Sequence, residues 1–175
     1  MRYFFGLLMG IIVAAGCTPS EPLTEMEQAE FEEEEVSAAP AWFDERIYSE
    51  ADSAAVYGYA MASATDSATA AELSAESALE NLRFEIDRRA ESIRSELAEN
   101  NGNGEYSSPS FIIQLRNAVQ AIDITGADMS FGHEETREGV HIVYTRAAIS
   151  RNQVYSILVD QLSDRQFIDR LQVDF

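Results

Sequence analysis

The stretch that decides the fold is Ala55–Ala64, which reads AVYGYAMASA. Its side chains alternate in size with a period of two, which predicts a β-strand whose two faces meet different surroundings. One face is small enough for a helix to pack close against it. The other must be covered, or it remains an exposed apolar patch that could contact a partner. The small face comprises Val56, Gly58, Ala60 and Ala62, and the large face comprises Tyr57, Tyr59 and Met61.

A long amphipathic helix is expected directly after this strand. Asp66 is a plausible N-cap, and residues 68–99 follow the 3.6-residue period of a helix that packs on a sheet. The remaining helix positions alternate arginine with glutamate, Glu85 among them, which is typical of a solvated helix surface. The apolar stripe comprises Leu73, Leu79, Leu82, Ile86, Ala90, Ile93 and Leu97.

The rest of the chain predicts a second helix, a hairpin and a last helix. Ser108 and Pro109 open a helix over residues 111–122, and two strands over 122–134 and 138–149 form a β-hairpin. Ser150 caps the last helix. The predicted fold is therefore α+β, a three-stranded antiparallel sheet with helices on one face, in the order β-α-α-β-β-α. The stripe of the last helix comprises Val154, Leu158, Leu162 and Ile168.

The N-terminus carries the features of an export signal. Met1-Arg2 is followed by a thirteen-residue apolar run over 3–15, which is shorter than a membrane span needs. Ala14-Ala15-Gly16-Cys17 then resembles the bacterial lipobox. The resemblance implies a signal peptide over 1–16 and a Cys17 that carries diacylglycerol and palmitate. The alternative is an ordinary signal peptide that happens to be followed by cysteine.

Residues 17–41 predict an acidic, disordered tether between this lipid and a domain over residues 42–175. The segment is rich in glutamate, and a block of like charges repels itself and stays extended. Thr18 and Pro19 follow the cysteine in place of the aspartate that often marks retention at the inner membrane. We therefore expect an outer-membrane location, and which face of that membrane carries the domain stays open.

Composition excludes some classes of partner. The chain of 175 residues has a formal charge of −19, and its 12 basic residues are all arginine. Nucleic acid is excluded as a partner because phosphate binding needs clustered cations. With a single cysteine, the chain cannot form an internal disulfide, so its stability must come from packing.

We find no motif in the sequence that predicts catalysis. His133 and His141 should lie on the two arms of the hairpin, with Glu134 and Glu135 beside the first, and such a set could suit zinc. The spacing is generic and the site would be open to solvent, so we expect no metal and no cofactor. A Ser-His-Asp set and a phosphate-binding glycine loop are both missing from the pattern, and we expect no enzyme activity.

Several segments are similar to the LPP-twenty family of bacterial outer-membrane lipoproteins. These are Pro40–Phe43, the strand Tyr57–Ala60, the alanine-rich helix opening over 68–78, and Ile122–Gly126. At the helix start, Ala71-Glu72 stands where the family has an Ala-Arg pair. The resemblance implies a small α+β lipoprotein domain without known catalysis, whose relatives in some cases support the flagellar base.

These observations favour an outer-membrane-anchored lipoprotein that acts as a non-catalytic structural, assembly or interaction module, with flagellar association implied by the resemblance alone. Its partners would be a second copy or other envelope or flagellar proteins. The contact surface would be Tyr57, Tyr59 and Met61, or the edge of the hairpin. The alternative is a periplasmic lipoprotein that binds a small ligand between sheet and helices.

Overall fold

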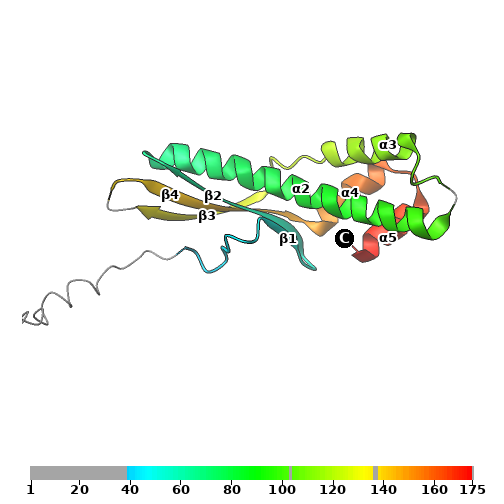
Figure 1. Cartoon of the computed structure of the whole chain (residues 1–175), viewed down its shortest axis with the longest axis horizontal. Helices are drawn as coiled ribbons and strands as arrows, with labels where there is room; N and C mark the ends of the chain where they lie inside the picture. The colour runs from blue at the N-terminus through cyan, green and yellow to red at the C-terminus, as the bar shows by residue number, and fades with distance from the viewer. Residues whose placement is uncertain (1–38, 103, 136–137, 175) are drawn as a thin grey trace, which may run out of the picture. The chain divides into compact units, whose positions relative to one another are not determined.

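Four antiparallel strands form a single sheet in the spatial order β1-β2-β4-β3 in the computed structural model, which describes residues 39–102, 104–135 and 138–174. Helix α2 lies along one face of this sheet (Figure 1). The α+β class and the antiparallel sheet are confirmed. The predicted leader, Cys17 and most of the tether lie outside the described residues. The strands are β1 (Ser49–Ala51), β2 (Ala55–Ala64), β3 (Asp128–Glu135) and β4 (His141–Ser150).

The close packing of β2 under helix α2 (Ser67–Asn101) is confirmed. Asp66 caps the helix by accepting a hydrogen bond from the backbone N–H of Thr69, at 2.8 Å. At Gly58 the two backbones come so close that a Cβ atom would overlap the carbonyl oxygen of Ala78 and the backbone nitrogen of Leu82. Only glycine permits this approach, so Gly58 sets the distance between helix and sheet.

The three-strand prediction is wrong because it missed β1. Asp52 accepts hydrogen bonds from the backbone N–H groups of Ala54 and Ala55, at 2.7 and 2.9 Å, which closes a tight turn between β1 and β2. Ser49 then pairs with Gly58 in the sheet. Three residues are too few to show an alternating pattern, so the short edge strand gave no periodic signal.

The hairpin of β3 and β4 is confirmed, with a later start than predicted. Residues 122–127 form a turn segment in place of a strand, because Asp123 Oδ1 accepts hydrogen bonds from both the backbone N–H and the hydroxyl of Thr125. Ile122 and Ile124 are buried in this segment, which explains the apolar pattern that was interpreted as strand.

The other helices gather around the half of α2 that extends beyond the sheet (Figure 1). Ser108 caps α3 and Ser150 caps α4, as predicted. The prediction of a single last helix is wrong, because this region forms two helices. Asp164 caps the second one by accepting a hydrogen bond from the backbone N–H of Phe167 at 2.7 Å. Phe167 is fully buried, whereas the predicted Ile168 is only half-buried. These helices are α3 (Pro109–Gln120), α4 (Arg151–Gln161) and α5 (Arg165–Asp174).

Two residues of α2 differ from the prediction, one on the apolar stripe and one on the predicted solvated surface. Leu73 is 46% exposed and lies off the buried stripe, where Ser74 is buried in its place. Ser74 Oγ lies 2.7 Å from Thr145 Oγ1 of β4, which satisfies both hydroxyls between helix and sheet. Glu85, expected at the solvated surface, is only 1% exposed.

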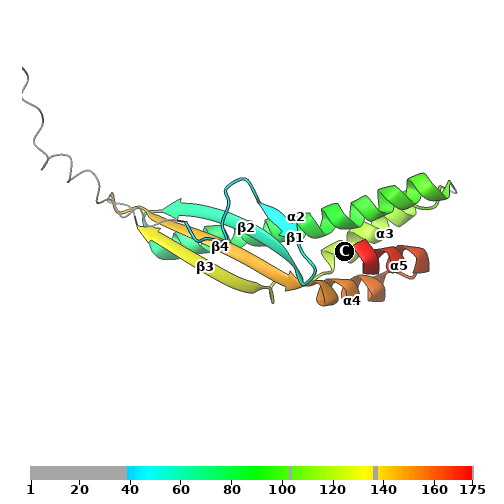
Figure 2. The same cartoon turned by 90° about the horizontal axis from the view of Figure 1, so that it is seen from below.

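The opposite face of the sheet is crossed by residues 39–48, which we call the strap. Figure 2 shows the strap looping over the face turned away from α2. Pro40 lies against Gly132 of β3, and Phe43 contacts Tyr144 of β4 with ring centroids 4.8 Å apart. Among the described residues, contact with the sheet is therefore already made by Pro40.

Among the helices of the described residues, none is long and apolar enough to cross a membrane.

Candidate functional site

The face under the strap collects aromatic side chains from two neighbouring strands. Register places Tyr59 of β2 opposite Arg146 of β4, and Met61 opposite Tyr144. Trp42 of the strap stacks on Tyr59, with ring centroids 6.3 Å apart. We call this region the strap face. It comprises the strap together with Tyr57, Tyr59, Met61, Tyr144 and Arg146.

Three tyrosines of the strap face donate hydrogen bonds to carboxylates. The Tyr59 hydroxyl donates to Glu50 at 2.6 Å, and burial together with this hydrogen bond raises the pKa of Tyr59 above its usual range. The same two causes, in the same order, raise the pKa of Tyr57 beside Asp52 and of Tyr144 beside Glu134. The three hydroxyls therefore stay protonated as donors, and each ring is held in one orientation.

Arg146 lies between two aromatic rings of the strap face. Its guanidinium carbon is 5.5 Å from the Trp42 ring centre and 5.9 Å from that of Tyr57. Its Nη2 donates to Ser130 Oγ at 3.3 Å, while its Nε is buried and has no hydrogen-bond partner among the described residues. The attraction between the cation and the rings therefore helps hold the strap on the sheet.

The rim of the strap face exposes large apolar side chains. Met61 is 51% exposed, Tyr48 66% and Ile47 40%, whereas Tyr59 is only 5% exposed. Of the predicted contact residues, the structure thus leaves Met61 most accessible, Tyr57 half-buried and Tyr59 beneath Trp42. Two hollows flank Phe43, of about 570 and 520 Å³. The first is lined by Phe43, Glu45, Arg46, Ile47, Tyr48, Tyr59, Ala60 and Met61.

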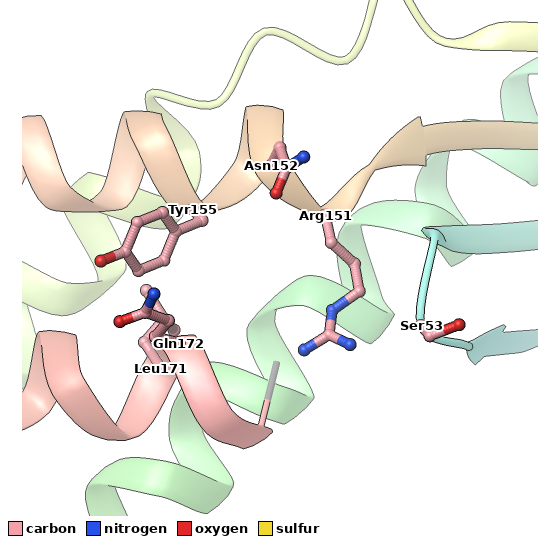
Figure 3. Close-up of a pocket in the computed structure, with 6 residues that line it drawn as sticks. All are labelled: Ser53, Arg151, Asn152, Tyr155, Leu171 and Gln172. Carbon is pink, nitrogen blue, oxygen red and sulfur yellow. The ribbon is translucent and has the colours of Figure 1, made fainter.

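A third hollow, of about 330 Å³, lies where the β1–β2 turn, α4 and α5 meet. Figure 3 shows the guanidinium of Arg151 reaching between Ser53 of the turn and Gln172 of α5. Arg151 Nη1 makes one long contact, 3.5 Å, to the carbonyl oxygen of Asp52. The lining side chains can hydrogen-bond a small polar group, but they hold no carboxylate, imidazole or thiol that would act as a base. They are Ser53, Arg151, Asn152, Tyr155, Leu171 and Gln172.

Glu85 is a buried carboxylate at the centre of a partly exposed polar cluster, and its position was predicted to be solvated surface. Burial raises the pKa of its carboxyl, but hydrogen bonds from Arg88 and Arg89 outweigh burial, so the net shift is downward. Those bonds measure 2.6 to 2.9 Å, and Ser49 of β1 donates a further one at 3.2 Å. Glu85 follows Leu82 by three residues, and that spacing could have placed it on the buried stripe.

His133 and His141 do come together on the hairpin, as predicted. Their rings lie 5.3 Å apart between centroids. Glu134, the carboxylate considered beside them, is occupied on the strap face, where it accepts from the Tyr144 hydroxyl at 3.0 Å. Within the described ranges, no group of three or more His, Cys, Asp or Glu side chains is arranged to hold a metal ion.

Trp42, Tyr144 and Arg146 were not identified as site residues from the sequence. Their meeting depends on the path of the strap across the sheet, for which the sequence has no short-range signal. No family model, no curated protein and no solved structure matches this chain, so its resemblance to the LPP-twenty family stays a prediction. The class that the structure defines is an α+β domain whose antiparallel sheet is covered by a helix on one face and by a strap on the other.

Proposed function

We propose that this chain is an outer-membrane lipoprotein, anchored through acylated Cys17, whose domain is a non-catalytic interaction module of the cell envelope. The strap face is its contact surface, and the partner is a second copy or another envelope protein. Membership of the LPP-twenty family and a flagellar association belong to the same proposal. They rest on the sequence resemblance and on no contact in the domain.

One observation carries the interaction role: large apolar side chains are exposed at the rim of the strap face, next to rings held in place by hydrogen bonds. Met61 and Tyr48 are each more than half exposed. Aromatic residues, methionine and arginine are enriched at protein interfaces, and ordered aromatic side chains lose little entropy on binding. Asp52, Glu50 and Glu134 already accept hydrogen bonds from the tyrosine hydroxyls, so the apolar rim is the part of this face that is left to meet a partner.

Site-specific cross-linking tests this role. A photoreactive phenylalanine analogue at Tyr48 should give a discrete adduct in cells that produce the full chain. The same analogue at Glu80, exposed on α2, is the matched control and should give none. Met61→Glu places a charge on the exposed rim without entering the core, and it should abolish the Tyr48 adduct. Equal adducts at Tyr48 and Glu80, or an adduct that survives Met61→Glu, would contradict the proposal.

The lipid anchor has its own measurement. Mass spectrometry of the mature N-terminus from membrane fractions should find a triacylated peptide that begins at Cys17. An unmodified N-terminus in the soluble periplasm would remove the anchor from the proposal, and it would leave the cross-linking result unaffected.

The hollow beside Phe43 favours one second candidate, a lipoprotein that binds a small apolar ligand. Its volume of about 570 Å³ lies within the range of ligand pockets. A thermal-shift screen of envelope metabolites distinguishes the two functions. A compound that stabilises the parent chain but not Met61→Glu would favour the small ligand. A screen without stabilisers would favour the protein partner.

A further inference from the structure

The two histidines of the chain meet on one face of the β3–β4 hairpin. His141 pairs with Glu135 in the register, and His133 pairs with Val143, so the two imidazoles are diagonal neighbours on the same side of the sheet. This side is the one that α2 covers further along the strands, where Val143 and Thr145 are buried. His133 is exposed and His141 is half-buried, so solvent and solutes reach the pair.

The distance between the two ring nitrogens fits a long hydrogen bond, and it fits two ligands of a shared cation equally well. His141 Nδ1 lies 3.4 Å from His133 Nε2. For comparison, N–H···O hydrogen bonds are most often about 2.9–3.0 Å long. Two imidazole nitrogens that each bind one tetrahedral Zn²⁺ at about 2.0–2.1 Å are necessarily about 3.3–3.4 Å apart. The observed separation therefore equals the bite of a two-histidine chelate.

Charge around the hairpin adds to the attraction for a cation. Asp66, at the start of α2, lies near enough to His141 for the two to interact electrostatically. Asp66 itself caps α2 through Thr69 and stays available only as a nearby negative charge. The whole chain carries a formal charge of −19, and such a field raises the local concentration of cations.

The sequence pattern alone predicts no metal here, but from the geometry of the two rings we propose that His133 and His141 form a two-histidine chelate for a divalent late-transition-metal cation such as Zn²⁺ or Cu²⁺, with water in the remaining coordination positions. Imidazole is a preferred ligand of both ions, and the Irving–Williams order places Cu²⁺ above Zn²⁺. Because the chelate has two protein ligands, the bound ion exchanges readily with the medium. This site is separate from the strap face and does not rest on the proposed function.

Metal titration of the full chain, purified in mild detergent and stripped with a chelator, tests the site. Calorimetry with ZnCl₂ should show one saturable site per chain. His133→Gln and His141→Gln should each weaken binding by at least about tenfold, and the double variant should remove it, because each deletes one arm of the chelate. Electron paramagnetic resonance with CuCl₂ should show coupling to two imidazole nitrogens in the parent chain and to one in each single variant.

Two controls separate the chelate from the many surface carboxylates. CaCl₂, a hard cation that prefers oxygen ligands, should not compete with Zn²⁺ at equal concentration. Asp66→Asn keeps an N-capping side chain and removes the nearby charge, so it should weaken Zn²⁺ binding by less than about threefold. The histidine variants should unfold at the same temperature as the parent chain. Zn²⁺ affinity that survives the double histidine variant, that Ca²⁺ competes away, or that Asp66→Asn abolishes would overturn the proposal.

Discussion

The two faces of the sheet are covered in different ways, one by helix α2 and the other by the strap. Under α2, small side chains let two backbones touch, and Val56, Ala78 and Ala147 are fully buried. Under the strap, Tyr59 and Tyr144 are buried and Tyr57 is half-buried, and a carboxylate accepts a hydrogen bond from each tyrosine hydroxyl. A face packed backbone to backbone cannot change without moving the helix, whereas a face of ordered rings can accept a new neighbour. The helix-covered face therefore contributes most to stability, and the strap face is the one that we propose to contact a partner.

The largest expected effect is at Gly58, where α2 lies closest to the sheet. Gly58→Leu would drive a side chain into the backbone of α2 at Ala78 and Leu82, and we expect it to lower the free energy of unfolding by about 3 kcal/mol or more. Urea unfolding followed by circular dichroism measures this loss. Gly126→Leu is the matched control, because its Cβ would meet open space, and it should change little. Equal losses of unfolding free energy in the two variants would contradict the claim that close backbone packing stabilises the helix-covered face.

A smaller loss is expected at the margin of the helix-covered face, where Glu85 joins α2 to β1. Glu85→Gln keeps the size of the side chain but weakens the bonds from Arg88 and Arg89, and it should cost about 1–3 kcal/mol at neutral pH. Glu91→Gln is the control and should cost less, since the Glu91 side chain is 49% exposed, although its partner Arg94 is only 14% exposed.

The difference in unfolding free energy between the parent chain and Glu85→Gln should depend on pH, and the pKa shift of Glu85 gives the direction. Its folded pKa is lowered from 4.5, so its contribution to stability is present above the unfolded value and is lost as pH falls through the folded pKa. The difference between the parent chain and Glu85→Gln should therefore shrink between about pH 7 and about pH 3. Urea unfolding at both pH values measures it, and a difference that grows in acid would show that Glu85 is not held as a carboxylate.

The smallest effect on stability is expected on the strap face. Trp42→Ala removes the ring that contacts both Arg146 and Tyr59, and it should lower the free energy of unfolding by about 1 kcal/mol, because the cation–π contact of a half-buried ring is weak. Hydrogen exchange should rise at the backbone amide of Phe43 and stay unchanged at Leu82 in the helix-covered core. Exchange that rises equally at both positions would show that the strap is part of the core.

The helix N-caps and the alternating side chains of β2 could be predicted from the sequence, because each depends on residues only a few positions apart. Asp66, Ser108 and Ser150 each cap the helix that was predicted to follow them. The site was less predictable. Tyr57, Tyr59 and Met61 were placed on one strand face, but their exposure depends on the strap, and the pattern of β2 alone cannot show that Trp42 covers Tyr59. The end of α4 and the start of α5 could have been predicted from a local pattern, because Asp164 is a capping residue three positions before the buried Phe167.

The sequence by itself determined the local conformations: a small-faced strand followed by a capped helix, a hairpin, and a glycine where helix and sheet must touch. These follow from the size, charge and backbone freedom of neighbouring residues. Only the tertiary structure decided that β1 forms one edge of the sheet, that Glu85 is buried, and that the strap crosses the face opposite α2. It also decided that His141 Nδ1 lies 3.4 Å from His133 Nε2. The physical reason is that such contacts join segments distant in the chain. Many pairings satisfy the same local pattern, and packing selects among them.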